Sequence, residues 1–305
     1  MTNVTIKQLR YFEALAQQQH FGRAAAACAI SQPALSVQIR ELERELGQAL
    51  FERSARHVRL TTFGADFAPQ ARVILQGVEE LEAFARVARD PLAGRFRMGI
   101  IPTIAPYMLP RLIPALASAF PALDLDVRET LTAQLTRELG EGRIDAAIVA
   151  LPVSEPGLAE HPLFDEPFLL VRQAAFRGEP VPQRGALGQM RLLLLEEGHC
   201  FRDQALSFCQ TRSPPPAAGL DGTSLGTLVQ MVGAGIGVTI IPQMARSVET
   251  RSADVACDPF PEPSPGRRIG MVWRKTNPLA EAFAQIARVV QQIGSEVVGA
   301  GKEAS

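Results

Sequence analysis

The stretch Ser31–Gly47, which reads SQPALSVQIRELERELG, decides the fold of the N-terminal part of this 305-residue chain. Ser31 is a favourable N-cap, Pro33 suits a first helical turn, and Gly47 ends the helix. Four apolar residues at three- and four-residue steps predict one buried face: Leu35, Ile39, Leu42 and Leu46. The preceding residues 21–28 (FGRAAAAC) predict a second, shorter helix.

Two helices joined by a tight turn are typical of a helix-turn-helix, here over Phe21–Arg40. The second helix begins with small polar residues, and such a helix can enter the major groove without bulk. Residues 58–64 (VRLTTFG) predict a hairpin wing, and a generic helical bundle is the alternative. The residues expected to cap the recognition helix, face base edges or neutralise phosphates are Ser31, Gln32, Pro33, Ser36, Gln38, Arg40, Arg53, Arg56 and Arg59.

Charge is distributed unevenly along the chain. The whole chain has a net charge of −1, but residues 1–64 hold eight Lys or Arg against five Asp or Glu, which gives +3. The remaining residues therefore sum to −4. A basic N-terminal unit is consistent with a nucleic-acid partner.

Residues 65–90 predict a helix with a heptad seam. Its apolar positions alternate four- and three-residue steps: Phe67, Ala71, Ile74, Val78, Leu81, Ala85 and Ala88. This spacing favours a two-stranded coiled coil, and hence at least a dimer, over a helix that lies on its own domain. Pro69 fits only if it lies in the first turn.

Residues 91–305 alternate short apolar strands with helices, which predicts a mostly parallel sheet between layers of helices. The apolar fraction of 47% and charged fraction of 21% are ordinary for a globular protein. The sequence carries no secretory signal pattern and no continuous apolar span. We therefore expect a cytoplasmic protein without a membrane segment.

Cys200 and Cys209 lie only nine positions apart in residues 196–209 (EEGHCFRDQALSFC). The intervening residues look helical, and nine residues of helix separate the two Cα atoms by roughly 13 Å. A disulfide requires about 4.4–6.8 Å, so bonding would force the segment to repack, as in a redox switch. We expect Cys28 and Cys257 to be structural.

The N-terminal 60 residues resemble the DNA-binding domain of LysR-type transcriptional regulators, on the motifs LRYFEALAQ, SQPALS and LFERSARHVRLTTFG. Residues 191–209 (RLLLLEEGHCFRDQALSFC), with IPTIAPYMLP and GAGIGVTIIP, resemble the OxyR, or peroxide-responsive, branch of that family. The resemblance implies a winged helix-turn-helix domain at 1–64 and a dimerising linker helix at 65–90. It also implies a 91–305 effector domain of two Rossmann-like α/β subdomains similar to periplasmic binding proteins. Subdomain I would cover about 93–163 and 269–305, and subdomain II about 164–268.

The same resemblance implies that Cys200 attacks hydrogen peroxide and that Cys209 then bonds to it. It assigns the peroxide pocket to Thr103, Thr132, His199, Arg202 and Asp203. His199, Arg202 and the start of a helix would favour the thiolate at Cys200, because a thiolate is the attacking form. Implied partners are promoter DNA at antioxidant genes, a second dimer in a homotetramer, and RNA polymerase. No cofactor and no metal are expected.

Two other functions remain open at the level of sequence. The chain would respond to a small metabolite in the cleft between subdomains if it behaved as an ordinary member of the family. It would be a cysteine-dependent peroxidase if peroxide turned over with a reductant, although the basic head and coiled coil have no purpose in such an enzyme.

Overall fold

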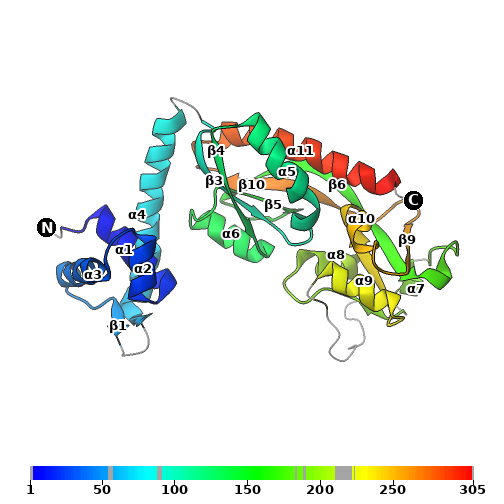
Figure 1. The fold of residues 1–305 in the computed structure, drawn as a ribbon, viewed down its shortest axis with the longest axis horizontal. Coiled ribbons are helices and arrows are strands. Elements are labelled where there is room, and N and C mark those ends of the chain that lie inside the picture. The colour runs from blue at the N-terminus through cyan, green and yellow to red at the C-terminus, as the bar shows by residue number, and fades with distance from the viewer. Residues whose placement is uncertain are drawn as a thin grey trace. The chain divides into compact units, whose positions relative to one another are not determined.

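The computed structural model describes residues 3–53, 58–87, 91–182, 184–187, 190–209, 222 and 224–303. The chain forms two compact units, Met1–Ala88 and Arg89–Ser305 (Figure 1). No helix within these described ranges is both long enough and apolar enough to cross a membrane.

The first unit is the expected helical domain with a two-stranded wing. Its elements are α1 (Ile6–Gln18), α2 (Phe21–Ala27), α3 (Gln32–Leu46), β1 (Phe51–Arg53), β2 (Val58–Leu60) and α4 (Thr62–Val87). The predicted cap of α3 is confirmed, since Ser31 Oγ accepts the backbone N–H of Ala34 at 3.3 Å. Gly47 ends α3 with a left-handed φ of 68°.

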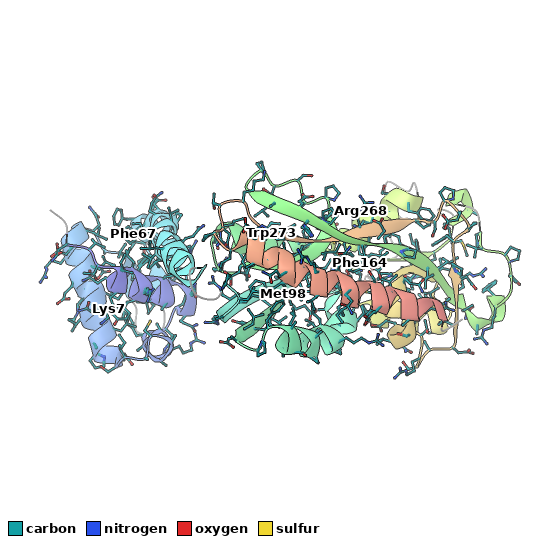
Figure 2. All side chains as sticks on the ribbon, turned by 90° about the horizontal axis from the view of Figure 1, so that it is seen from above. Lys7, Phe67, Met98, Phe164, Arg268 and Trp273 are labelled. Carbon is teal, nitrogen blue, oxygen red and sulfur yellow. The ribbon has the colours of Figure 1, made fainter. Side chains whose placement is uncertain are left out.

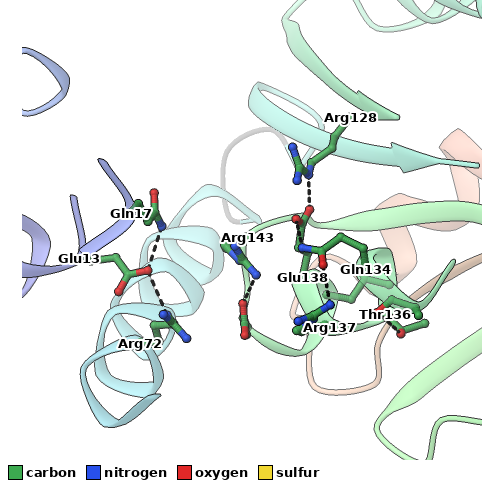
Figure 3. A network of polar contacts seen from close by, with 12 residues as sticks. Glu13, Gln17, Arg72, Arg128, Gln134, Thr136, Arg137, Glu138 and Arg143 are labelled. Atoms are coloured by element: carbon green, nitrogen blue, oxygen red, sulfur yellow. Dashed lines mark hydrogen bonds and ion pairs between the residues drawn. The ribbon is translucent and has the colours of Figure 1, made fainter. Parts of the chain in front are cut away.

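The first turns of α4 pack on the helical domain itself. The ring of Phe67, labelled in Figure 2, lies 5.1 Å from that of Phe12, and Ala71 is fully buried. Arg72 pairs with Glu13 at 3.0 Å (Figure 3). The expectation for Pro69 is wrong, because α4 begins at Thr62 and the proline lies inside the helix.

The expected seam of α4 therefore divides into two parts. Its early residues Phe67 and Ala71 belong to the core of this unit. Further along, Ile74 is 50% exposed and Leu81 is 68% exposed. Val73, next to Ile74, is 65% exposed. Within the first unit, the later part of α4 thus presents uncovered apolar side chains.

The second unit is built on eight strands. They are β3 (Gly94–Ile100), β4 (Leu123–Glu129), β5 (Ala146–Leu151), β6 (Leu158–Gln173), β7 (Leu192–Leu193), β8 (Val238–Pro242), β9 (Val255–Pro259) and β10 (Gly266–Arg274). The order is β4-β3-β5-β10-β6-β8-β7, with β9 also on β6. Four of the seven strand pairs among the described residues are antiparallel. The expectation of a mostly parallel sheet is therefore wrong, because β6 and β10 run antiparallel to each other through its middle.

Strand β6 joins the two halves of the effector unit. Its residues up to Pro167 pair with β10, and its residues from Phe168 onward pair with β8 and β9. The change of partner thus falls a few residues beyond Phe164, where we expected the chain to cross. Helix α11 (Ala280–Glu303) runs along β6 and β10 (Figure 1).

The remaining helices of this unit cover the two halves of the sheet. They are α5 (Ala105–Ala119), α6 (Thr132–Gly140), α7 (Arg184–Leu187), α8 (Cys200–Cys209), α9 (Leu225–Gly233) and α10 (Arg246–Glu249), with 3-10 turns η1 (Ala174–Phe176) and η2 (Gln243–Ala245). On α11, Phe283 packs its ring against Trp273 and Phe96 at 6.0 and 5.3 Å. Figure 2 shows Trp273 beneath this helix.

Two glycines of α11 give a matched test of this packing. A Cβ added to Gly294 would collide with the ring of Phe164, whereas one added to Gly299 meets nothing within 4 Å. We expect Gly294→Ala to lower the free energy of unfolding by about 1–3 kcal/mol through overpacking. Gly299→Ala should raise it by about 0.5–1 kcal/mol, because alanine favours a helix. Chemical denaturation measures both, and equal effects at the two sites would contradict the packing.

Candidate functional site

Cys200 is the first residue of α8 and is partly buried. The chain reaches it through Gly198, whose φ of 94° is a left-handed conformation that side chains disfavour. The turn is closed by a hydrogen bond of 3.0 Å from the backbone N–H of Arg202 to the carbonyl of His199. The N–H groups and dipole of a helix start favour negative charge, so the local fold places the thiol where an anion is stabilised.

A narrow recess lies beside Cys200, and in this structure it leaves no free volume for a water-sized molecule. Three segments line it, at 101–103, 131–132 and 199–201. The lining residues are Ile101, Pro102, Thr103, Leu131, Thr132, His199, Cys200 and Phe201. Pockets for drug-sized ligands enclose roughly 300–1,000 Å³, so this recess is closed by comparison, and a ligand of a few atoms would enter it only with movement of its lining.

Thr132 lines this recess, and its hydroxyl has no partner among the described residues. Its Oγ1 is buried and forms no hydrogen bond with any of the described residues. A buried polar group left unsatisfied costs about 1–3 kcal/mol. Such a group is available to a small polar ligand.

A polar network fixes the helix that carries Thr132 (Figure 3). Glu138, 1% exposed, accepts hydrogen bonds from Arg128 Nε at 2.5 Å and Gln134 Nε2 at 2.6 Å. Burial acts to raise the pKa of Glu138, but these two hydrogen bonds and the charge of Arg128 hold that pKa below its usual value. The ionised carboxylate ties α6 to β4 and so sets the position of its first residue.

Thr103 is held by Arg267, a residue that the sequence analysis missed. Thr103 is 3% exposed, and Arg267 donates to its Oγ1 at 2.7 Å and to its carbonyl at 3.0 Å. The guanidinium also lies 5.5 Å from the ring centre of Phe201. Since 164 positions separate Arg267 from Thr103, no local pattern in the sequence reveals the pair.

His199 lines the recess but differs from expectation in its charge. Burial lowers the pKa of His199, and the nearby Glu196 only opposes that effect. The neutral imidazole is therefore favoured near neutral pH. His199 offers hydrogen bonds to a ligand rather than a positive charge beside Cys200.

Arg202 and Asp203 do not line the recess. Arg202 donates to the carbonyl of Leu195 at 2.6 Å, so its guanidinium is directed to the backbone of its own segment. Asp203 is exposed and lies at a second, wider pocket of about 530 Å³ that shares Cys200 and Thr132 with the recess. The structure thus brings together Thr103, Thr132, His199 and Cys200, and places these two residues outside.

Cys209 is the last residue of α8 and is 2% exposed. The predicted helix between the cysteines is confirmed, and nine helical steps correspond to roughly 13.5 Å along the axis. None of the four cysteines forms a disulfide in this structure. The candidate redox pair is therefore held apart at opposite ends of one intact helix.

Comparisons with known proteins agree with this architecture. Residues 6–65 match the bacterial regulatory helix-turn-helix protein model of the lysR family, and residues 89–293 match the LysR substrate binding domain. The DNA-binding transcriptional dual regulator OxyR of Escherichia coli is 40% identical, over 94% of this chain and 95% of that protein. A probable hydrogen peroxide-inducible genes activator of Streptomyces viridosporus is 41% identical, over 94% of each.

The chain belongs to the LysR family of transcriptional regulators, in its OxyR branch. Solved structures support the same placement. Full-length OxyR from Pseudomonas aeruginosa, as a cysteine-to-aspartate variant, gives a TM-score of 0.78 at 37% identity over 95% of this chain and 96% of that one. A cysteine-to-serine mutant of Corynebacterium glutamicum OxyR with hydrogen peroxide bound gives 0.68 at 36% identity, over 98% and 95%.

In this LysR-family fold, one face of α3 is exposed. Pro33, Val37 and Arg40 are exposed at helical spacing with Ser36 between them, and Gln32 is exposed at the helix start. Val37, 44% exposed, was missed by the sequence analysis. An apolar residue there suits contact with a thymine methyl.

The other expected DNA contacts are placed less uniformly. Gln38 donates to Glu41 at 2.8 Å, and Ser31 is occupied as the cap of α3. Arg53 is in β1 and Arg59 is exposed on β2. Arg56 lies outside the described residues.

The two remaining cysteines differ from Cys200 in their surroundings. Cys28 is the C-cap of α2, and burial raises the pKa of its thiol. Cys257 lies in β9, and burial, opposed by Arg246, raises its pKa to about 12. Both thiols stay protonated near neutral pH, which suits structural roles.

The lowered pKa of His199 predicts a pH dependence of stability. A histidine whose pKa is lower in the folded than in the unfolded chain stabilises the fold fully above about pH 6.5. That contribution is lost as the pH falls through the folded pKa. We expect the free energy of unfolding of wild type to fall more between about pH 7.5 and 5.5 than that of His199→Gln. Denaturation series at both pH values measure this, and equal pH dependence would show that His199 is not held neutral.

Proposed function

We propose that this protein is a peroxide-sensing transcription regulator in which Cys200 is oxidised by hydrogen peroxide and then forms a disulfide with Cys209. The observation that carries the proposal is the buried, unpartnered hydroxyl of Thr132, which lines the same recess as Cys200. The name of the Streptomyces viridosporus relative, a probable hydrogen peroxide-inducible genes activator, and the peroxide-bound structure of Corynebacterium glutamicum OxyR support the same signal.

The recess offers polar groups that complement hydrogen peroxide. Arg267 has no acceptor, so Thr103 must accept from it and keeps its hydroxyl proton for another partner. Thr132 has both a proton and lone pairs to offer, and neutral His199 has one donor and one acceptor. Hydrogen peroxide has two O–H donors and two acceptor oxygens, so these groups can hold it beside the thiol.

The proposed chemistry has two steps. The Cys200 thiolate attacks one peroxide oxygen, so an S–O bond forms, the O–O bond breaks, and the departing hydroxide takes a proton to become water. The Cys209 thiolate then attacks the sulfur of the sulfenic acid, so that an S–S bond forms and the S–O bond breaks. The hydroxide that leaves is protonated to a second water.

The helix supplies the switch in this proposal. A separation of roughly 13.5 Å along α8 exceeds the 4.4–6.8 Å that a disulfide allows, so α8 must unwind for the bond to form. Closing so short a loop restricts the unfolded chain by roughly 3 kcal/mol. Inverting a two-state population requires about 5.5 kcal/mol, so loss of the α8 packing must supply the remainder.

Oxidation would act on DNA through the assembly. Exposed Val73, Ile74 and Leu81 on α4 support a dimer through this helix, which would present two recognition helices to successive major grooves. Pairing of dimers into a homotetramer and contact with RNA polymerase belong to the same proposal. The wider pocket at Asp203 supports a second candidate, a regulator that responds to a small metabolite.

Free-thiol counts test the sensing chemistry. A brief, stoichiometric dose of hydrogen peroxide should remove two thiols per chain from wild type and none from Cys200→Ser. Cys209→Ser should lose one thiol and form no disulfide. A wild-type protein that keeps all four thiols would favour the metabolite-responsive regulator. Sustained peroxide turnover with a reductant would instead indicate an enzyme.

Salt dependence of DNA affinity tests the role of α3. Arg40 is exposed on the face proposed to meet DNA, so Arg40→Ala should remove one phosphate contact. The slope of log affinity against log salt should become shallower by about 0.9. Arg111→Ala, which removes an exposed arginine from α5 of the other unit, is the control and should leave the slope unchanged. An unchanged slope for Arg40→Ala in a titration on promoter DNA would exclude that contact.

A further inference from the structure

We propose that Glu166 is a positioning residue for the oxidation of Cys200, because it holds Arg267 so that Thr103 directs its hydroxyl proton into the recess. The inference rests on the proposed function. It assigns a role in the peroxide reaction to a side chain on β6 that does not itself line the recess.

Glu166 and Arg267 form an ion pair that is wholly enclosed. Both side chains are 0% exposed, and Arg267 Nε donates to Glu166 Oε2 at 2.8 Å. The other carboxylate oxygen, Oε1, accepts the backbone N–H of Met244 at 2.8 Å. The carboxylate is thus fixed at both oxygens, and it fixes the guanidinium at Nε.

The other end of the guanidinium holds Thr103 in place. The two terminal nitrogens of Arg267 donate to Thr103 Oγ1 and to its backbone carbonyl. A guanidinium is planar and rigid, so fixing Nε on Glu166 also fixes the direction of both terminal nitrogens. The hydroxyl of Thr103 must accept from Arg267, and its proton is left to point elsewhere.

The same guanidinium also touches the wall of the recess. It lies over the ring of Phe201, and that ring packs edge-on against Phe168 at 5.0 Å. Phe201 directly follows Cys200 at the start of α8. A shift of Arg267 would therefore disturb both the hydrogen-bond donor and the apolar wall beside the reacting sulfur.

A purely stabilising role explains this pair less well. Taking two charges out of water costs much of what their attraction returns, so a buried ion pair is weak evidence for stability. An apolar pair of similar size would fill the same space at no such cost. What an apolar pair cannot do is orient a hydroxyl group.

The first test compares the reactivity of Cys200 toward two reagents. Glu166→Gln keeps the size of the side chain and an oxygen for the N–H of Met244, but it removes the charge that holds Arg267. We expect the second-order rate constant for hydrogen peroxide to fall about tenfold or more, in line with loss of oriented hydrogen-bond stabilisation. Alkylation by iodoacetamide, which contains no O–O bond to polarise, should change less than about twofold on the same grounds.

The neighbouring Asp165 supplies a matched control. Asp165 also pairs with an arginine, Arg268, but that pair is exposed to solvent, with side chains 70% and 59% exposed. Asp165→Asn should leave both rate constants unchanged. Equal peroxide rate constants for Glu166→Gln and wild type would overturn the proposal, as would parallel losses toward both reagents.

A double-mutant cycle shows whether Glu166 acts through Thr103. Thr103→Val should slow peroxide oxidation, and adding Glu166→Gln to it should cause no further loss. A rate constant for the double variant that falls by the product of the two single losses would contradict action through Thr103. If peroxide oxidises Thr103→Val slowly but Glu166→Gln at the wild-type rate, the positioning role of Glu166 is contradicted and the proposed function is not. If wild type loses no thiols to peroxide, the proposed function itself is contradicted.

Glu166→Gln leaves Arg267 buried without a charged partner and for that reason could fail to fold, so a second variant is needed. Replacing both partners, Glu166→Met with Arg267→Met, leaves no buried charge and is expected to fold. Its peroxide rate constant should fall, but no further than that of Thr103→Val. A folded double variant that oxidises at the wild-type rate would overturn the proposal.

Discussion

The length of α8 is the constraint on which the effector unit depends. Ten residues of helix hold Cys200 and Cys209 at opposite ends, and neither is in a disulfide. A disulfide and an intact helix cannot coexist between these positions, because the helix separates the Cα atoms by about twice the distance that a disulfide spans. Any bond between them must exchange the packing of Phe201, Ala205 and Cys209, all buried in the core, for another arrangement.

Around Cys200 the fold assembles a recess whose polar groups come from distant parts of the chain. Thr132 begins α6, Thr103 follows β3, and Arg267 reaches both Thr103 and Phe201 from β10. The side chain of Arg267 is fixed in turn by Glu166 on β6. Strands β6 and β10 also carry the chain between the two halves of the sheet. The strands that join the two halves thus also carry the side chains that hold Thr103 at the recess.

Sequence patterns predicted those features that depend on local spacing. The cap at Ser31, the end of α3 at Gly47 and the helix between the cysteines all follow from residues within a few turns of one another. Features that depend on tertiary contacts were missed or misjudged. Burial makes His199 neutral, Arg202 turns to a backbone carbonyl, and Arg267 lies 164 positions from its partner. The prediction of strand direction was wrong for the same reason. Alternation of strands and helices does not reveal that β10 runs antiparallel to β5 and β6 in the middle of the sheet.

Amide hydrogen exchange across Gln204–Phe208 tests the central claim most directly, because it reports whether the helix survives disulfide formation. In the reduced protein these amides should be protected by the hydrogen bonds of α8. After one equivalent of hydrogen peroxide, their protection should fall while that of α11 remains, and Cys209→Ser should keep α8 protected after the same treatment. A confirmed disulfide between Cys200 and Cys209 with α8 still fully protected would contradict the incompatibility of bond and helix.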